Sequence, residues 1–203
     1  MTAEARGTQP PQQNALRRLS RPVVWAVVRV LAKTPVTPNT ITVFGLLVTA
    51  AAAYVIATGG LFWGGVILLA GSALDALDGE LARQTDRVSV FGAFLDSTID
   101  RVQEGLLFMG LALYYTALAS MWGVALSFLA LLGSYLVSYT RARAEGLGFK
   151  GEFGFMSRPI RIILLGGALL LGWPLPALGI LALFTTVTAI QRSAAVARQA
   201  GEK

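Results

Sequence analysis

Charged residues avoid three long stretches of the chain. These stretches lie between Lys33 and Asp75, between Glu104 and Arg141, and between Arg161 and Arg192. A helix needs about 20 apolar residues to cross a hydrocarbon core about 30 Å thick, so each stretch accommodates two spans joined by a short outer turn. The pattern predicts an all-α membrane protein with six transmembrane helices.

Proline and glycine positions indicate where these helices begin and end. Pro38 suits a first helical turn because a missing N–H does no harm there, and Gly59 with Gly60 favours a turn. A loop rich in Gly and Phe is expected over 146–157. The expected spans are about 38–57, 61–83, 90–119, 122–145, 159–171 and 176–195.

The residues before the first span divide into two parts. Residues 1–12 are polar and rich in Pro and Gln, which predicts a disordered cytoplasmic tail. Within 13–33, basic and apolar residues occupy opposite faces of a helix, which indicates an amphipathic helix in the membrane interface. A capping helix packed on the bundle would have the same pattern. Residues 34–203 form the predicted transmembrane catalytic domain.

The basic residues give the expected orientation. They cluster before the first span, between spans two and three, between spans four and five, and after the sixth, whereas the other turns carry no charge. Lys and Arg remain on the cytoplasmic side during insertion. We therefore expect a multi-pass protein of the cell (inner) membrane with both termini and the active site cytoplasmic.

Composition narrows the chemistry. Hydrophobic residues make up 55% of the chain and charged residues 14%, and there is neither His nor Cys. Disulfides, zinc sites and catalysis by His or Cys are thereby excluded, and oxygen atoms are left as the metal ligands. We expect the lipid bilayer as a partner and no nucleic acid.

Four aspartates provide those oxygen atoms. Asp75 and Asp78 are three residues apart near the end of the second span, and Asp96 and Asp100 are four apart near the start of the third. Each pair shares one helix face. Carboxylates gathered at the edge of lipid need neutralising cations, and four suit two Mg²⁺ or Mn²⁺ ions, as in phosphoryl displacement. Alternatively, they are helix-end charges paired with nearby arginines.

Two glycines and an arginine accompany the aspartates. At Gly79 and Gly92 the missing side chain would let a base and ribose approach the backbone, although small residues also allow close helix packing. Arg83 lies four residues after Gly79, so it can face the same cavity and contact a phosphate. The group predicts a site for a nucleoside diphosphate.

These residues resemble the DxxDGxxARx(8)GxxxDxxxD signature of the CDP-alcohol phosphatidyltransferases. The matching positions are Asp75, Asp78, Gly79, Ala82, Arg83, Gly92, Asp96 and Asp100. The resemblance implies six helices behind an interfacial helix, CDP-diacylglycerol as donor, CMP release and a homodimer. It also implies that the four aspartates hold metal and that Asp100 is the general base. Further contacts with the CDP-lipid are implied for Pro38, Asn39, Thr40, Thr42 and Ser89. No role is assigned to Glu80 or Glu104.

The acceptor is inferred from a second basic cluster. Arg141 and Arg143 lie near the end of the fourth span, and Arg158 lies at the start of the fifth, where free N–H groups favour an anion. Membrane orientation alone would also explain these charges. The surrounding sequence resembles the branch that uses inositol phosphate. Glycerol 3-phosphate is the alternative acceptor, and a cation transporter or a structural scaffold is the alternative without this activity.

Overall fold

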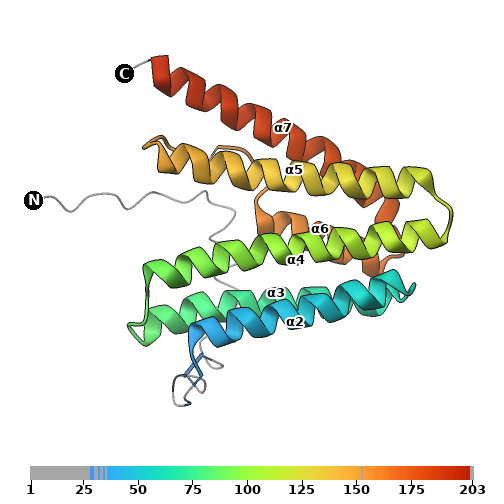
Figure 1. The fold of residues 1–203 in the computed structure, drawn as a ribbon, viewed down its shortest axis with the longest axis horizontal. Coiled ribbons are helices and arrows are strands. Elements are labelled where there is room, and N and C mark those ends of the chain that lie inside the picture. Colours follow the sequence, from blue (N-terminus) through green and yellow to red (C-terminus); the bar gives the residue numbers. More distant parts are fainter. Residues whose placement is uncertain (1–27, 30–31, 33, 35, 152, 202–203) are drawn as a thin grey trace, which may run out of the picture.

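The computed structural model describes residues 28–29, 32, 34, 36–151 and 153–201. The described residues form helices without any strand, which confirms the all-α prediction (Figure 1). The predicted tail and most of the predicted amphipathic helix, 13–33, lie outside the described residues. The helices are α2 Pro38–Ala57, α3 Leu61–Gln84, α4 Val90–Ala117, α5 Met121–Gly146, α6 Arg158–Leu170 and α7 Pro174–Gly201.

The helices lie alongside one another and reverse direction at each connection (Figure 1). Helix α2 packs against α3 and α4, α4 packs against α5, and α5 packs against α7. The bundle has two halves, one formed by α2, α3 and α4 and the other by α5, α6 and α7. The short helix α6 contacts both α3 and α7, so it joins its own half to the other. The end of α3 and the start of α4 lie at the same end of the bundle as the end of α7, and α6 begins beside the middle of α4.

Local capping explains why the helices start where they do. Thr37 accepts a hydrogen bond from the Thr40 N–H, and Pro38 follows in the first turn of α2. Ser89 accepts a 2.9 Å bond from the Gly92 N–H at the start of α4. The helices begin at 38, 61 and 90, which confirms the predicted starts. Helix α7 is longer than the predicted 176–195, because its Ala-rich end contains no helix breaker.

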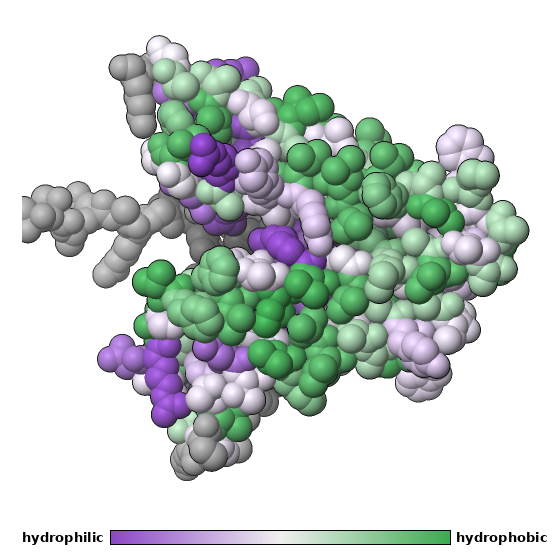
Figure 2. Space-filling view, viewed as in Figure 1, coloured by the Kyte–Doolittle hydropathy of each residue, from purple (hydrophilic) through white to green (hydrophobic). Residues whose placement is uncertain are grey.

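Four helices of the described chain, α2, α3, α5 and α7, are long and apolar enough to cross a membrane. Helix α4 carries Asp96, Asp100 and Glu104 between its start and its middle, and α6 has 13 residues, about 20 Å at 1.5 Å per residue. Hydrophobic side chains cover much of the surface, whereas hydrophilic ones gather at one end and in a hollow (Figure 2). The structure therefore supports a multi-pass protein, and the count of six spans stays a prediction.

A buried ion pair joins α6 to α4 next to the main apolar cluster. Arg161 donates from Nε and Nη2 to the two Glu104 carboxylate oxygens, each at 2.8 Å. Its Nη1 donates to the Met156 carbonyl at 2.9 Å. Both side chains are only 2% exposed. The pair fixes the start of α6 beside the middle of α4, and it gives Glu104 a structural role.

Removing one charge of this pair should destabilise the bundle. In Glu104→Gln, Arg161 keeps a buried charge without a carboxylate, which we expect to cost about 3–5 kcal/mol in the free energy of unfolding. Glu145→Gln is the matched control, because Glu145 pairs with Arg141 on the exposed end of α5. Unfolding in detergent should show a clearly larger loss for Glu104→Gln. Equal losses in both variants would contradict a structural role for the buried pair.

Candidate active site

Two neighbouring helix ends present the four aspartates. Asp75 and Asp78 lie in the last turns of α3, and Asp96 and Asp100 lie in the first turns of α4. Asp78 is repelled by Asp96 and Asp75, and Asp100 is repelled by the same two carboxylates. The four negative charges thus share one electrostatic environment at the hydrophilic end of the bundle.

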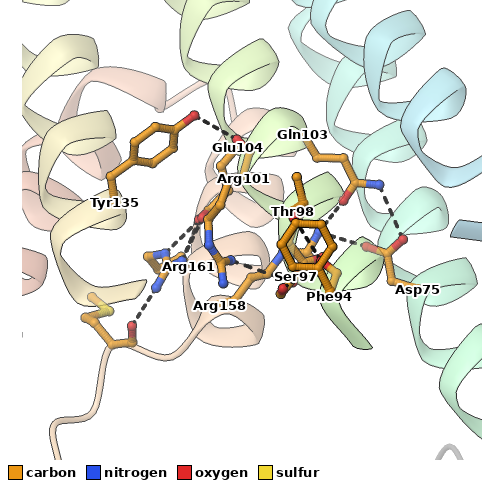
Figure 3. Close-up of polar contacts among 12 residues, drawn as sticks. Asp75, Phe94, Ser97, Thr98, Arg101, Gln103, Glu104, Tyr135, Arg158 and Arg161 are labelled. Carbon is orange, nitrogen blue, oxygen red and sulfur yellow. Dashed lines mark hydrogen bonds and ion pairs between the residues drawn. The ribbon is translucent and has the colours of Figure 1, made fainter. Parts of the chain in front are cut away.

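Arg158, the first residue of α6, lies between two of these carboxylates. Its Nη2 donates to Asp75 Oδ2 at 2.8 Å, and its Nη1 lies 3.0 Å from Asp100 Oδ1. The same Nη2 donates to Gln103 Oε1, and the Gln103 amide donates to Asp75 Oδ1 at 3.4 Å. Figure 3 shows Arg158, Gln103 and Asp75 of this network beside the Glu104–Arg161 pair. One guanidinium therefore connects α3, α4 and α6.

Asp78 is the most deeply buried of the four and is held differently. It is 5% exposed and accepts a 2.6 Å hydrogen bond from the Thr42 hydroxyl of α2. Thr42 Oγ1 also lies 3.1 Å from the Pro38 carbonyl oxygen. The hydroxyl links the start of α2 to the end of α3 and satisfies one carboxylate oxygen, which burial would otherwise leave without a partner.

Gly45 provides space for Asp75. A Cβ at this position would lie 2.8 Å from Asp75 Oδ1 and 3.3 Å from the Gln103 amide nitrogen. A separation below 3 Å from a carboxylate oxygen forces a shift, so any side chain at Gly45 would displace Asp75. The residue shapes the site although it contributes no chemistry of its own.

The residues implied for CDP-lipid binding lie on three helix ends. Pro38, Asn39, Thr40 and Thr42 begin α2, Gly79, Ala82 and Arg83 end α3, and Ser89 and Gly92 begin α4. Asn39 and Gly92 are neighbours, because a Cβ on Gly92 would lie 3.4 Å from Asn39 Oδ1. Arg83 pairs with Glu80 at 2.8 Å, and its side chain is 60% exposed. Arg83 thus points toward the surface of the end that presents the aspartates.

The three arginines expected to bind the acceptor phosphate have different surroundings. Arg158 contacts the aspartates, as described above. Arg141 forms a 2.8 Å ion pair with Glu145 on the exposed end of α5, and Arg143 lies exposed in the last turn of that helix. Arg192 of α7 is buried and experiences repulsion from Arg141 and Arg161. The basic cluster therefore extends from α5 to α7.

Sequence reasoning missed several residues of the site. Gln103 lies three residues after Asp100 on the same helix face, so the spacing could have identified it. Likewise Arg161 lies three residues after the predicted Arg158 on α6, and it pairs with Glu104 on α4. Gly45 has no comparable signal, because its role depends on how closely α2 approaches α3.

The donor set fits a hard divalent cation by charge and by atom type. The four carboxylates offer oxygen ligands only, as Mg²⁺ and Mn²⁺ prefer. Within the described residues, no three acidic side chains already form a metal-binding group. Instead, Arg158 supplies the positive charge between Asp75 and Asp100. The aspartates therefore suit metal chemically, and an arginine compensates two of them in this structure.

Comparison with known proteins places this site in a family. An archaetidylinositol phosphate synthase of Pyrococcus horikoshii is 41% identical over 81% of this chain and 85% of its own length. A phosphatidylinositol phosphate synthase of Mycobacteroides abscessus is 39% identical over 81% of this chain and 79% of its own.

Solved structures show the same fold. The crystal structure of Mycobacterium tuberculosis phosphatidylinositol phosphate synthase with CDP-DAG bound superimposes with a TM-score of 0.80 at 29% identity, covering 86% of this chain and 94% of that one. A structure of that enzyme in complex with manganese and citrate gives a TM-score of 0.79. Residues 35–193, which include all four aspartates, match the CDP-alcohol phosphatidyltransferase family. The chain belongs to the CDP-alcohol phosphatidyltransferase family.

Proposed function

We propose that this protein transfers the phosphatidyl group of CDP-diacylglycerol to a hydroxyl of inositol phosphate and releases CMP. The observation that carries the proposal is the meeting of four signature aspartates with the basic start of α6 at one end of the bundle. Relatives that are 35–41% identical are named for phosphatidylinositol phosphate or archaetidylinositol phosphate synthesis, which supports the acceptor. Family membership favours this activity over a cation transporter or a scaffold.

The aspartates would hold the metal. Asp75, Asp78, Asp96 and Asp100 are the proposed ligands for two Mg²⁺ or Mn²⁺ ions, and the manganese complex of the M. tuberculosis relative supports a divalent cation. When bound, such ions stabilise negative charge on the attacking and leaving oxygens. The protein's own contribution is to fix the carboxylates: Thr42 positions Asp78, and Gln103 positions Asp75.

Asp100 is the proposed general base. Its side chain is partly exposed and lies beside the Arg158 guanidinium, with Arg101 Nη1 3.7 Å from its other oxygen. These positive charges offset part of the cost that burial adds to ionising the carboxylate, and the ionised form can accept the proton of the acceptor hydroxyl. The freed oxygen then bonds to the phosphorus that bears the lipid. The bond from that phosphorus to CMP breaks, and CMP leaves with its electron pair.

The helix ends would bind the two substrates on different sides. The starts of α2 and α4 and the end of α3 are proposed to bind the CDP-lipid, where Gly92 leaves the backbone open beside Asn39. Arg141, Arg143 and Arg158 are proposed to bind the acceptor phosphate, as Arg forms strong bonds to phosphate oxygens. Glycerol 3-phosphate remains the alternative acceptor, since it needs the same cations.

The placement in the membrane completes the proposal. Four candidate spans support a multi-pass protein. We propose six spans behind an interfacial helix, with residues 34–203 as the catalytic domain. Because the basic residues gather at the end with the aspartates, we place that end and both termini in the cytoplasm, at the cell (inner) membrane. The family resemblance implies a homodimer.

Replacing the proposed base tests the mechanism. Asp100→Asn should lower the rate of CMP release from CDP-diacylglycerol by about 10²–10⁴-fold, because the amide cannot accept the proton. Asp86→Asn is the matched control, because Asp86 is exposed between α3 and α4 and has a φ of 55° that Asn tolerates. A chelator should stop the reaction, and Mg²⁺ or Mn²⁺ should restore it. Turnover by Asp100→Asn at the wild-type rate would rule out Asp100 as the base.

An acceptor series tests the substrate. With CDP-diacylglycerol present, inositol phosphate should support CMP release far better than inositol, serine or glycerol 3-phosphate. Arg141→Ala should raise the KM for inositol phosphate about tenfold, the effect of losing one hydrogen bond to a charged group. Arg87→Ala, in the exposed loop after α3, should leave the KM unchanged. A higher kcat/KM with glycerol 3-phosphate would favour the alternative acceptor.

A further inference from the structure

Two arginines on the first turn of α6 are held in different ways. Arg161 uses Nε, Nη1 and Nη2 in hydrogen bonds and is buried. Among the described residues, Arg158 bonds through its Nη atoms only and its buried Nε has no hydrogen-bond partner, and 19% of its side chain is exposed. The guanidinium of Arg158 is therefore held through its two Nη atoms, and turning the side chain away breaks its described polar contacts, which are with Asp75, Gln103 and Asp100.

The contacts of Arg158 use oxygen atoms that the proposed function assigns to metal. Nη2 lies 2.8 Å from Asp75 Oδ2 and Nη1 lies 3.0 Å from Asp100 Oδ1. Asp96 is near enough to be attracted by Arg158 and repelled by Asp75. A single positive charge leaves this cluster of carboxylates with excess negative charge. A divalent cation at the same oxygens would interact more strongly with them and would repel the guanidinium.

We propose that Arg158 is the resident counter-ion of Asp75 and Asp100, and that it leaves them for the acceptor phosphate when a divalent cation binds. The inference rests on the proposed function and deepens it. The arginine would be a positioning residue that neutralises the carboxylates before metal binds and offers its guanidinium to the acceptor afterwards. Metal and acceptor would thus bind cooperatively, because each favours the same orientation of one side chain.

Gln103 supports this exchange. It is 2% exposed, its amide nitrogen donates to Asp75 Oδ1, and its carbonyl oxygen accepts from Arg158. After Arg158 turns away, the hydrogen bond from the Gln103 side-chain amide to Asp75 would remain and keep that carboxylate in place. Gly45 leaves the space that both side chains occupy. The carboxylate is therefore held independently of the arginine that compensates its charge.

Direct measurement of Mn²⁺ binding tests the proposal. The full-length protein in detergent, without substrate, would be titrated with Mn²⁺ and the free ion followed by electron paramagnetic resonance. Arg158→Gln should bind Mn²⁺ about tenfold more tightly than wild type, because the competing charge is gone. Arg158→Lys keeps the charge but cannot bridge two carboxylates, so its affinity should lie between the two.

A second arginine provides the matched control. Arg101 also lies near Asp100, at 3.7 Å, but it contacts no second aspartate of the described chain. Arg101→Gln should change the affinity for Mn²⁺ less than Arg158→Gln does. Equal gains in Mn²⁺ affinity in the two variants would show that any nearby positive charge has the same effect, and would overturn the counter-ion role of Arg158.

Thermal unfolding gives an independent readout. Without metal, Arg158→Gln should melt below wild type, and saturating Mn²⁺ should remove most of that difference. The inference would be overturned, while the metal role stands, if folded Arg158→Gln bound Mn²⁺ no more tightly than wild type. If the Gln variant does not fold, the same comparison is made with Arg158→Lys. If wild type itself binds no Mn²⁺, the proposed metal role fails together with the inference.

Discussion

The need to neutralise four carboxylates at the edge of an apolar bundle governs how this protein is built. Burying negative charge without a partner costs several kcal/mol, so every helix near the aspartates contributes something that offsets it. Helix α2 supplies the Thr42 hydroxyl, α4 supplies the Gln103 amide, and α6 supplies the Arg158 guanidinium. The site is thus a product of tertiary packing, although its carboxylates come from two helices alone.

Helix α6 depends on this constraint most directly. It is short and packs against α3 and α7, and its first turn points two arginines at two acids of α4. Arg161 donates from all three of its side-chain nitrogen atoms and anchors the helix, whereas Arg158 holds together the polar network at the aspartates. With Arg161 on Glu104 and Arg158 on the aspartates, one helix both joins the halves of the bundle and reaches the candidate active site.

Sequence patterns predicted the parts of this structure that depend on local spacing. The charge-free stretches gave the helices, and α2 matches its expected bounds, 38–57. The spacing of the aspartates placed them at facing helix ends, and the signature identified the family. The packing of the helices against one another determined the features that were not predicted. These are the close approach of α2 that makes Gly45 necessary, and the position of α6 that brings Arg158 between Asp75 and Asp100. Neither follows from a period along one helix.

The signature residues and the exposed basic residues lie in different halves of the bundle. The signature residues lie on α3 and α4, and the start of α2 packs beside them, so the proposed metal and nucleotide sites belong to one half of the bundle. The exposed cations Arg141 and Arg143 lie on α5, outside that half. Among the described contacts, α6 alone brings an arginine from the second half onto the aspartates, so this helix couples the proposed acceptor side to the carboxylates.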